Sequence, residues 1–188
     1  MEHSAVLDRS EHDYEADEVL VVDDREGLRA LANDLRGKIV VRLRDRARSI
    51  TELAEELGLP KGTVGHHVKV LENAGLVRVV RTRKVRALTE RYYGRTARLF
   101  VVKGEEHPDE VRNFVAVGLR RAAEELRPPV EGEESTSAYV HARLTPEDAR
   151  RFTRRVEKLL DDVQAANTPE GTPYGFVYAL YPAGAPRG

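Results

Sequence analysis

The stretch LGLPKGTVGHHVKVLENAGLV, residues 57–77, leaves three kinds of site open. Its glycines suit a phosphate-binding loop, its paired histidines suit a metal site, and its apolar spacing suits a helix that faces an external partner. Val64, Val68 and Leu71 recur at intervals of four and three residues, which places them on one face of a helix. The spacing therefore predicts a helix that begins near Pro60.

A shorter helix is predicted just before it, in the segment RSITELAEELG. Ser49 and Glu52 have the spacing of a capping box, in which each side chain satisfies a free amide at the start of a helix. The apolar stripe of this helix is predicted to be Leu53, Ala54 and Leu57. Gly58 and Gly75 are expected to end the two helices. Two short helices joined by a tight turn are typical of a helix-turn-helix.

The segment after Gly75 has a composition typical of strands, with valine, threonine and tyrosine among closely spaced arginines. We expect two antiparallel strands, near 77–83 and 88–95, joined by a basic turn. This region contains one acid, Glu90, and eight basic residues: Arg78, Arg81, Arg83, Lys84, Arg86, Arg91, Arg95 and Arg98. A basic hairpin directly after a helix-turn-helix is typical of a winged helix, whose wing contacts the DNA backbone or the minor groove. A solvated edge hairpin explains one or two such arginines, but explains eight poorly.

The other two kinds of site fit the opening stretch poorly. A phosphate-binding loop needs Gly-Lys-Ser/Thr after a buried strand, whereas Lys61 precedes Gly62 here and follows a helix. His66 and His67 are adjacent, so their side chains point about 100° apart on a helix and do not converge on one ion. The chain has no cysteine and no common catalytic motif. We therefore expect no cofactor, no metal site and no enzymatic activity.

The net charge of −1 hides a segregation of charge along the chain. Residues 36–98 carry 16 basic and 6 acidic side chains, a net charge of +10. The flanking residues 1–35 and 99–188 carry −8 and −3. A basic block inside a nearly neutral chain predicts a surface that binds a polyanion. The alternative is chance patchiness in an arginine-rich protein.

The composition is typical of a soluble, charged globular protein, with 40% hydrophobic and 34% charged residues. Its apolar runs are too short to span a bilayer, and its acidic N-terminus does not resemble a secretory signal. We therefore expect a cytoplasmic protein with no membrane partner.

The chain is predicted to have three parts within a mainly α fold with small β elements (α+β). Residues 1–18 are expected to form a mobile acidic tail. Residues 19–100 are expected to form the winged helix-turn-helix DNA-binding domain. Residues 101–188 are expected to form a C-terminal helical or α+β region for dimerisation, with an effector pocket as a further possibility.

Further elements are expected on both sides of the helix-turn-helix. The segment EVLVVDD is either a short strand or an apolar lead-in to a helix beginning near Asp23 or Asp24. Apolar residues from Leu28 to Leu43 follow helical spacing, with a break expected near Gly37.

The C-terminal part is predicted to begin with a helix that resumes near Arg98 or after Pro108. The range 109–127 is a good amphipathic helix and a candidate dimerisation element. After a linker, we expect a strand at AYVHARL, a helix in TPEDARRFTRRVEKLLDDVQAAN and a strand at YGFVYALY.

The outward side of the second helix is predicted to read DNA. With its apolar stripe buried, the helix offers its first turn and its opposite face to the major groove. The candidate residues are Lys61, Gly62, Thr63, Gly65, His66, His67 and Lys69. Lysine donates to guanine or phosphate, threonine offers a hydroxyl and a methyl group, and glycine permits close backbone approach. For His67, packing within the helix pair is an equal alternative to phosphate contact.

The run ITELAEELGLPKGTVGHHVKVLENAGLVRVVRTR resembles the ArsR-type winged helix transcriptional regulators. The resemblance implies a homodimer that binds double-stranded DNA at a near-palindromic operator and represses until a small-molecule effector arrives. It places Lys61, Thr63, Gly65, His66 and His67 in the recognition helix, and Arg81, Arg83, Lys84 and Arg86 in the wing. Members of the family commonly have serine where Pro60 and Gly65 stand here. The cysteine ligands of the classical metal sensors are also absent, so metal sensing through thiolates is not carried over.

These observations predict a sequence-specific DNA-binding transcriptional regulator that acts as a homodimeric repressor. The alternative is a winged helix that serves as a protein-interaction or scaffold module, with its basic face on an acidic partner.

Overall fold

The computed structural model describes residues 13–85, 88–104, 106–138, 140–168 and 170–181. The chain divides into two compact units, residues 1–121 and 122–188. The sequence placed a boundary at residue 100, whereas strand Ala97–Val102 and most of the helix Pro108–Glu125 belong to the first unit. Within the described ranges, no helix is long and apolar enough to cross a membrane.

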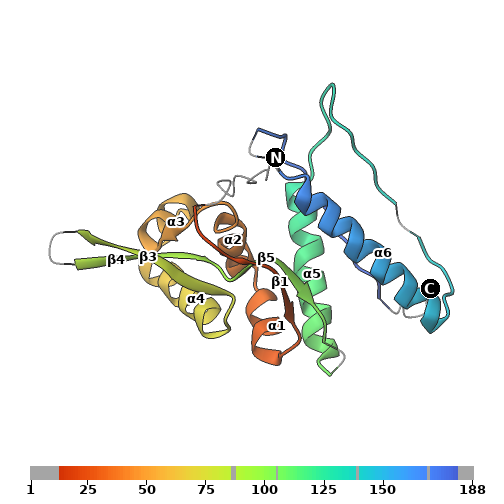
Figure 1. Ribbon diagram of the computed structural model, residues 1–188, viewed down its shortest axis with the longest axis horizontal. Coiled ribbons are helices and arrows are strands. Elements are labelled where there is room, and N and C mark those ends of the chain that lie inside the picture. Colours follow the sequence, from red (N-terminus) through yellow and green to blue (C-terminus); the bar gives the residue numbers. More distant parts are fainter. Residues whose placement is uncertain (1–12, 86–87, 105, 139, 169, 182–188) are drawn as a thin grey trace, which may run out of the picture. The chain divides into compact units, whose positions relative to one another are not determined.

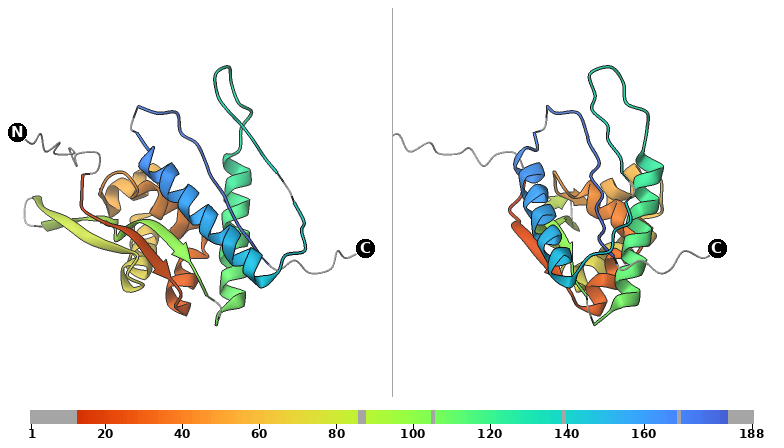
Figure 2. Two further views of the ribbon diagram at one scale, coloured as in Figure 1. Left: turned by 45° about the vertical axis from the view of Figure 1, so that its right-hand side comes forward. Right: turned by 90° about the vertical axis from the view of Figure 1, so that its right-hand side faces the viewer.

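The first unit is an α+β winged helix (Figures 1 and 2). Its elements are β1 (Asp17–Val22), α1 (Arg25–Leu31), α2 (Asp34–Arg42), β2 (Arg48–Ser49), α3 (Ile50–Leu57), α4 (Lys61–Asn73), β3 (Val77–Val85), β4 (Leu88–Arg95), β5 (Ala97–Val102) and α5 (Pro108–Glu125). One sheet has the strand order β2-β4-β3, and β1 pairs in parallel with β5. The β3–β4 hairpin extends away from the helices α3 and α4 (Figure 1).

Local capping rules explain the helix-turn-helix. The Ser49 hydroxyl accepts a hydrogen bond from the Glu52 amide at 3.3 Å, and the Glu52 carboxylate accepts one from the Ser49 amide at 2.7 Å. Gly58 ends α3 with a φ of 65°, a left-handed conformation that favours glycine. Gly75, with a φ of 68°, follows α4 in the same way. The predicted capping box and both predicted helix ends are confirmed.

The core of the first unit joins the helices to the sheet. Fully buried side chains from five elements meet there: Leu28, Ile39, Leu53, Val64, Val68, Leu71 and Val77. The apolar stripe predicted for α4 is therefore its buried face. Each such side chain stabilises the fold by about 1.5–3 kcal/mol relative to an exposed one.

Two predictions for the N-terminal region are wrong. Residues 13–18 of the predicted tail are structured, since Tyr14 is buried and β1 begins at Asp17; the rest of that tail lies outside the described residues. The helical break falls at Asn33, which caps α2 by accepting a hydrogen bond from the Arg36 amide at 3.1 Å. Gly37 is buried within α2, where a side chain would overlap the Arg121 guanidinium.

The observed strands decide three further expectations, for the segment EVLVVDD, for a helix near Arg98 and for the hairpin. EVLVVDD forms β1, and Asp24 then caps α1 through the Gly27 amide at 2.8 Å. The alternative of a helix resuming near Arg98 is wrong, because this residue lies in β5. The hairpin strands are confirmed.

The second unit contains α6 (Pro146–Ala165), which follows the predicted helix closely. The two strands expected to flank it are wrong for the described residues, because neither 140–144 nor 173–181 is assigned as a strand. Alternating apolar residues in these segments lack a paired neighbour, and a strand needs one to satisfy its backbone groups.

Candidate nucleic-acid interface

The side chains on the outward face of α4 do not pack against the rest of the first unit. Lys61, Gly62, Thr63, His66 and Lys69 are exposed, opposite the buried stripe of the helix. No side chain caps the first turn, because the N-cap is Pro60. The amides at this end of the helix are therefore available to an external acceptor, and the helix dipole favours an anion there.

Two glycines on this face have room for a side chain. A Cβ atom at Gly62 would meet nothing within 4 Å, and one at Gly65 would lie 3.6 Å from the Ile50 Cδ1 atom, an ordinary contact. Neither glycine is required by packing or by a left-handed φ. Each costs helix stability of up to about 1 kcal/mol relative to alanine.

His67 differs from its neighbours because it is half-buried. Its Nδ1 atom is buried and has no hydrogen-bond partner among the described residues. Burial lowers the pKa of His67, and the nearby charges of Arg36 and His66 lower it further. The packing alternative raised for this residue agrees with its position. A neutral, half-buried imidazole is a poor phosphate ligand.

The two ends of the β3–β4 hairpin, the predicted wing, present different basic groups. Arg83 and Lys84, toward the turn, are exposed, and no ion pair involves them within the described part of the chain. Cross-strand pairing places Arg83 opposite Glu90. Arg86 lies outside the described residues. Within the described part of the wing, Arg83 and Lys84 are thus free cations near the turn, as a phosphate-contacting role requires.

The base of the wing is occupied by the N-terminal segment. Arg81 forms an ion pair with Asp13 at 3.5 Å, and its guanidinium lies 4.5 Å from the Tyr92 ring centroid. Arg78 donates a hydrogen bond to the Glu15 carbonyl oxygen at 3.0 Å. These two arginines therefore have structural partners already. Lys69 on α4 likewise pairs with Glu72 at 3.0 Å.

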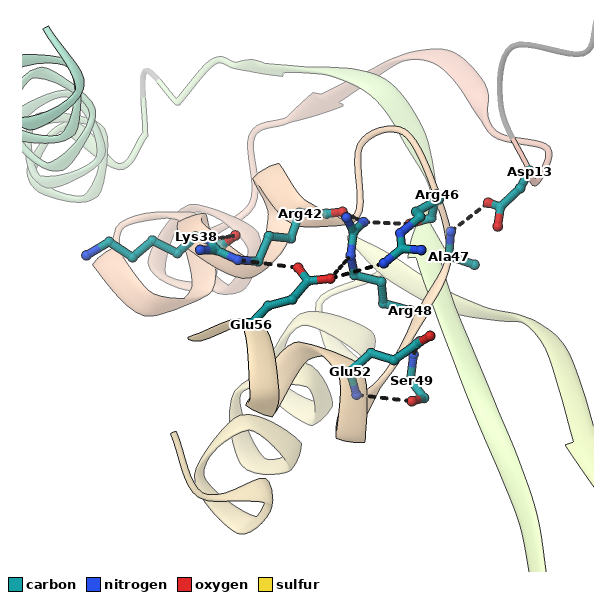
Figure 3. A network of polar contacts seen from close by, with 9 residues as sticks. All are labelled: Asp13, Lys38, Arg42, Arg46, Ala47, Arg48, Ser49, Glu52 and Glu56. Atoms are coloured by element: carbon teal, nitrogen blue, oxygen red, sulfur yellow. Dashed lines mark hydrogen bonds and ion pairs between the residues drawn. The ribbon is translucent and has the colours of Figure 1, made fainter. Parts of the chain in front are cut away.

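A cluster of arginines around Glu56 fixes α3 in place (Figure 3). The Glu56 carboxylate accepts a hydrogen bond from Arg48 at 2.8 Å, and ion pairs with Arg46 at 3.2 Å and with Arg42 at 3.6 Å. Asp13 accepts a hydrogen bond from the Ala47 amide at 2.6 Å. No local motif in the sequence predicts this cluster. The only signal was the concentration of arginines between the two predicted helical regions.

A cleft of about 560 Å³ lies elsewhere in the first unit, between α1 and α5. Glu110 is buried there and accepts a hydrogen bond from Arg25 at 2.8 Å. Its carboxylate also forms an ion pair with Arg29 at 3.2 Å. The cleft is polar, and the effector pocket considered for residues 101–188 stays a prediction. Within the described ranges, no group of three or more acidic or histidine side chains is arranged to hold a metal ion.

Taken together, these elements define a winged helix-turn-helix whose second helix, α4, has an exposed and partly basic outer face. Comparison with known proteins gives the same class. Residues 31–80 match the family model described as a helix-turn-helix domain. The transcriptional repressor SmtB of Mycobacterium tuberculosis is 44% identical over 50 residues, which are 27% of this chain and 37% of the relative. The transcriptional regulator NmtR of the same organism is 42% identical over 50 residues, or 27% of this chain and 42% of the relative.

The match is thus confined to the helix-turn-helix region, and the chain spans about two fifths of the length of these relatives. Over that region, the resemblance to ArsR-type winged helix regulators is confirmed. Among solved structures, HlyU from Vibrio cholerae is 25% identical, with a TM-score of 0.34, and the match covers 54% of this chain and 90% of that chain.

Proposed function

We propose that this protein is a sequence-specific DNA-binding transcriptional regulator. The proposal is carried by the first turn and outer face of α4, where Lys61, Thr63 and His66 are exposed beside uncapped helix amides. In this arrangement α4 enters the major groove, with Thr63 and His66 on base edges and Lys61 on a guanine or a phosphate.

Arg83 and Lys84 supply the second part of the interface. Both are exposed and near the turn of the wing, where they neutralise phosphates without reading sequence. Arg78 and Arg81 have partners in the N-terminal segment, so their proposed role is to hold the wing rather than to meet DNA. Lys69 can exchange Glu72 for a phosphate, since exposed ion pairs contribute little.

We further propose that the regulator is a homodimeric repressor that recognises a near-palindromic operator. A single α4 contacts few base pairs, and two copies related by a two-fold axis read two half-sites. Both matched relatives are transcriptional regulators, and SmtB is a repressor. The absence of cysteine argues that any effector is not sensed through metal-bound thiolates.

The test is a fluorescence-anisotropy titration of the full chain with duplex DNA from its own promoter and with a scrambled duplex of the same composition. We expect binding to the promoter at least about a hundredfold tighter, in keeping with specific protein–DNA complexes. Equal, weak binding to both duplexes would overturn the proposal and favour the winged helix as a protein-interaction module.

A second arm separates direct base reading from general affinity. Thr63→Ala or His66→Ala should change the preferred sequence in a selection from random duplexes. Glu55→Ala, an exposed change on the neighbouring helix α3, is the control and should leave the preference unchanged. Identical preferences for all variants would contradict base reading by α4.

A further inference from the structure

The helix α6 carries a heptad repeat that the DNA-binding proposal does not use. Ala149, Phe152, Val156, Leu159 and Val163 follow one another at steps of three, four, three and four residues. This is the a/d spacing of a coiled coil, in which one apolar seam faces a partner helix. Thr145 caps the helix by accepting a hydrogen bond from the Asp148 amide at 3.1 Å, so α6 has a defined start.

The seam is only partly covered in the second unit, where Ala149, Phe152 and Val156 are half-buried. No described residue of α6 is buried, and Leu159 and Val163 are 45% and 40% exposed. Tyr178 hydrogen bonds to Thr153, so the segment after α6 contacts one flank of the helix. The open part of the seam is therefore its later half, at Leu159 and Val163. An apolar stripe of this length is stable in water only when another surface covers it.

Charges beside the seam point to a second copy of α6 in the opposite direction. In this repeat the a positions are Ala149, Val156 and Val163. In an antiparallel pair that matches Val156 with the partner's Leu159, the residues just before the a positions of the two helices lie side by side on one flank. At a rise of about 1.5 Å per residue, Arg155 then lies within about 3 Å along the axis of Asp162 in the other copy. The two-fold axis repeats the contact, which gives two attractive pairs.

The parallel alternative lacks these pairs. In a parallel coiled coil, each charge would lie beside the position five residues further along the partner. Arg155 would then face Leu160, and Asp162 would face Asn167. Within the described residues neither Arg155 nor Asp162 has an ion-pair partner. Both are exposed, so both are free to pair with another chain.

We propose that α6 forms an antiparallel coiled coil with α6 of a second copy of this chain. The second unit is then a self-association module, and its exposed seam is an interface between copies. The proposal does not depend on DNA binding, because none of its residues belongs to the α4 face or to the wing.

The absence of cysteine permits a direct test on the full chain. Val156→Cys and Leu159→Cys are prepared as separate proteins, mixed in equal amounts without DNA and treated with a mild oxidant. We expect a disulfide-linked dimer from the mixture and little from either protein alone. Cross-linking of each variant with itself to the same extent would mean parallel or non-specific pairing and would overturn the proposal. No cross-linking in the mixture would also overturn it.

The matched control is a mixture of Arg154→Cys and Asp161→Cys, which lie level with each other in the same antiparallel register but on the outer face of α6. This mixture should not cross-link. Charge reversal supplies a second readout that a misfolded variant does not reproduce. In the Val156→Cys and Leu159→Cys backgrounds, Arg155→Asp alone and Asp162→Arg alone should each slow cross-linking about tenfold. Both reversals together should restore it, and failure of this rescue would contradict the Arg155–Asp162 pairing.

These measurements are separable from the promoter titration. If the cross-linking fails, the α6 pairing is wrong but the DNA-binding proposal is untouched. If the promoter preference fails, the DNA-binding proposal is wrong but the cross-linking result still stands. The two proposals therefore fail independently.

Discussion

The Tyr14 hydroxyl accepts a hydrogen bond from the Arg95 amide at 3.1 Å and donates one to the Leu43 carbonyl oxygen. The Arg98 guanidinium lies 4.9 Å from the centroid of the Tyr14 ring. One buried tyrosine thus joins the N-terminal segment, the end of α2 and the end of the wing. Burial raises the pKa of Tyr14, and burial lowers the pKa of Arg95 to about 10.

Tyr14→Phe should lower the free energy of unfolding by about 1–3 kcal/mol. The ring and its packing remain, but the Arg95 amide and the Leu43 carbonyl lose their partner in a buried place. Urea unfolding followed by circular dichroism measures the difference. Tyr174→Phe removes a hydroxyl from an exposed tyrosine and is the control, with an expected change within about 0.5 kcal/mol. Equal effects of the two substitutions would contradict the structural role of Tyr14.

Glu56→Gln should lower the free energy of unfolding by up to about 1 kcal/mol, because the Glu56 carboxylate is partly exposed and its ion pairs are partly screened. Glu55→Gln on the same helix is the control, since Glu55 is exposed and has no ion pair within the described residues. Burial raises the pKa of Glu56, but hydrogen bonds and charges from Arg48 and Arg46 outweigh it and leave the pKa lowered.

The lowered pKa gives this prediction a pH dependence. A carboxyl group with a depressed pKa in the folded protein stabilises the fold above its unfolded value, here 4.5, and this stability is lost as the pH falls further. The difference between wild type and Glu56→Gln should therefore be constant near pH 7 and shrink below pH 4.5. A difference that stays constant to pH 3 would show that the variant acts through packing instead.

Local rules explain why the helix-turn-helix was predictable. Ser49, Glu52 and Gly58 determine the limits of α3 through contacts within a few residues, and such contacts are readable from spacing. The buried stripe of α4 follows from helical period alone. The candidate DNA-binding residues on its outer face could be named for the same reason.

Long-range contacts explain what the sequence did not reveal. Tyr14 meets Arg95 across 81 residues, and no local pattern marks an isolated tyrosine in an acidic segment as buried. Gly37 suggested a break in the helix, but it lies within α2, with the guanidinium group of Arg121 placed against it. His67 looked like its neighbour His66, and only three-dimensional packing distinguishes the half-buried ring from the exposed one.

His67 should make the folded protein less stable under mildly acidic conditions than at neutral pH. Its pKa is lowered in the folded protein, so the unfolded chain binds a proton more readily than the folded chain does. Stability should therefore be full above the ordinary value of 6.5 and fall as the pH drops through the lowered value. His67→Leu should reduce this loss between pH 7.5 and pH 5 in thermal unfolding experiments. Identical profiles for wild type and variant would contradict the burial of a neutral imidazole.

Arg83→Ala combined with Lys84→Ala should weaken binding to promoter and scrambled DNA by about the same factor. These side chains are proposed to meet phosphates, which carry no sequence information. The slope of log K against log salt concentration should fall in magnitude by about 1–2, since each lost phosphate contact removes about one released counterion. Arg154→Ala combined with Lys158→Ala on α6 is the charge-matched control and should leave the slope unchanged. An unchanged slope in the wing variant would contradict phosphate contact by the wing.

Gly65→Ala separates the needs of the fold from those of DNA binding. The added Cβ atom meets Ile50 at ordinary contact distance, so nothing in the packing opposes it. Alanine should therefore raise the free energy of unfolding by about 0.5–1 kcal/mol. If the DNA backbone or a base edge approaches Gly65 closely, the same methyl group should weaken promoter binding although it stabilises the helix. Urea unfolding and the anisotropy titration measure the two effects on one protein. A variant that is more stable and binds equally well would show that Gly65 is not kept small for DNA, and a variant that loses stability would contradict the space seen beside Ile50.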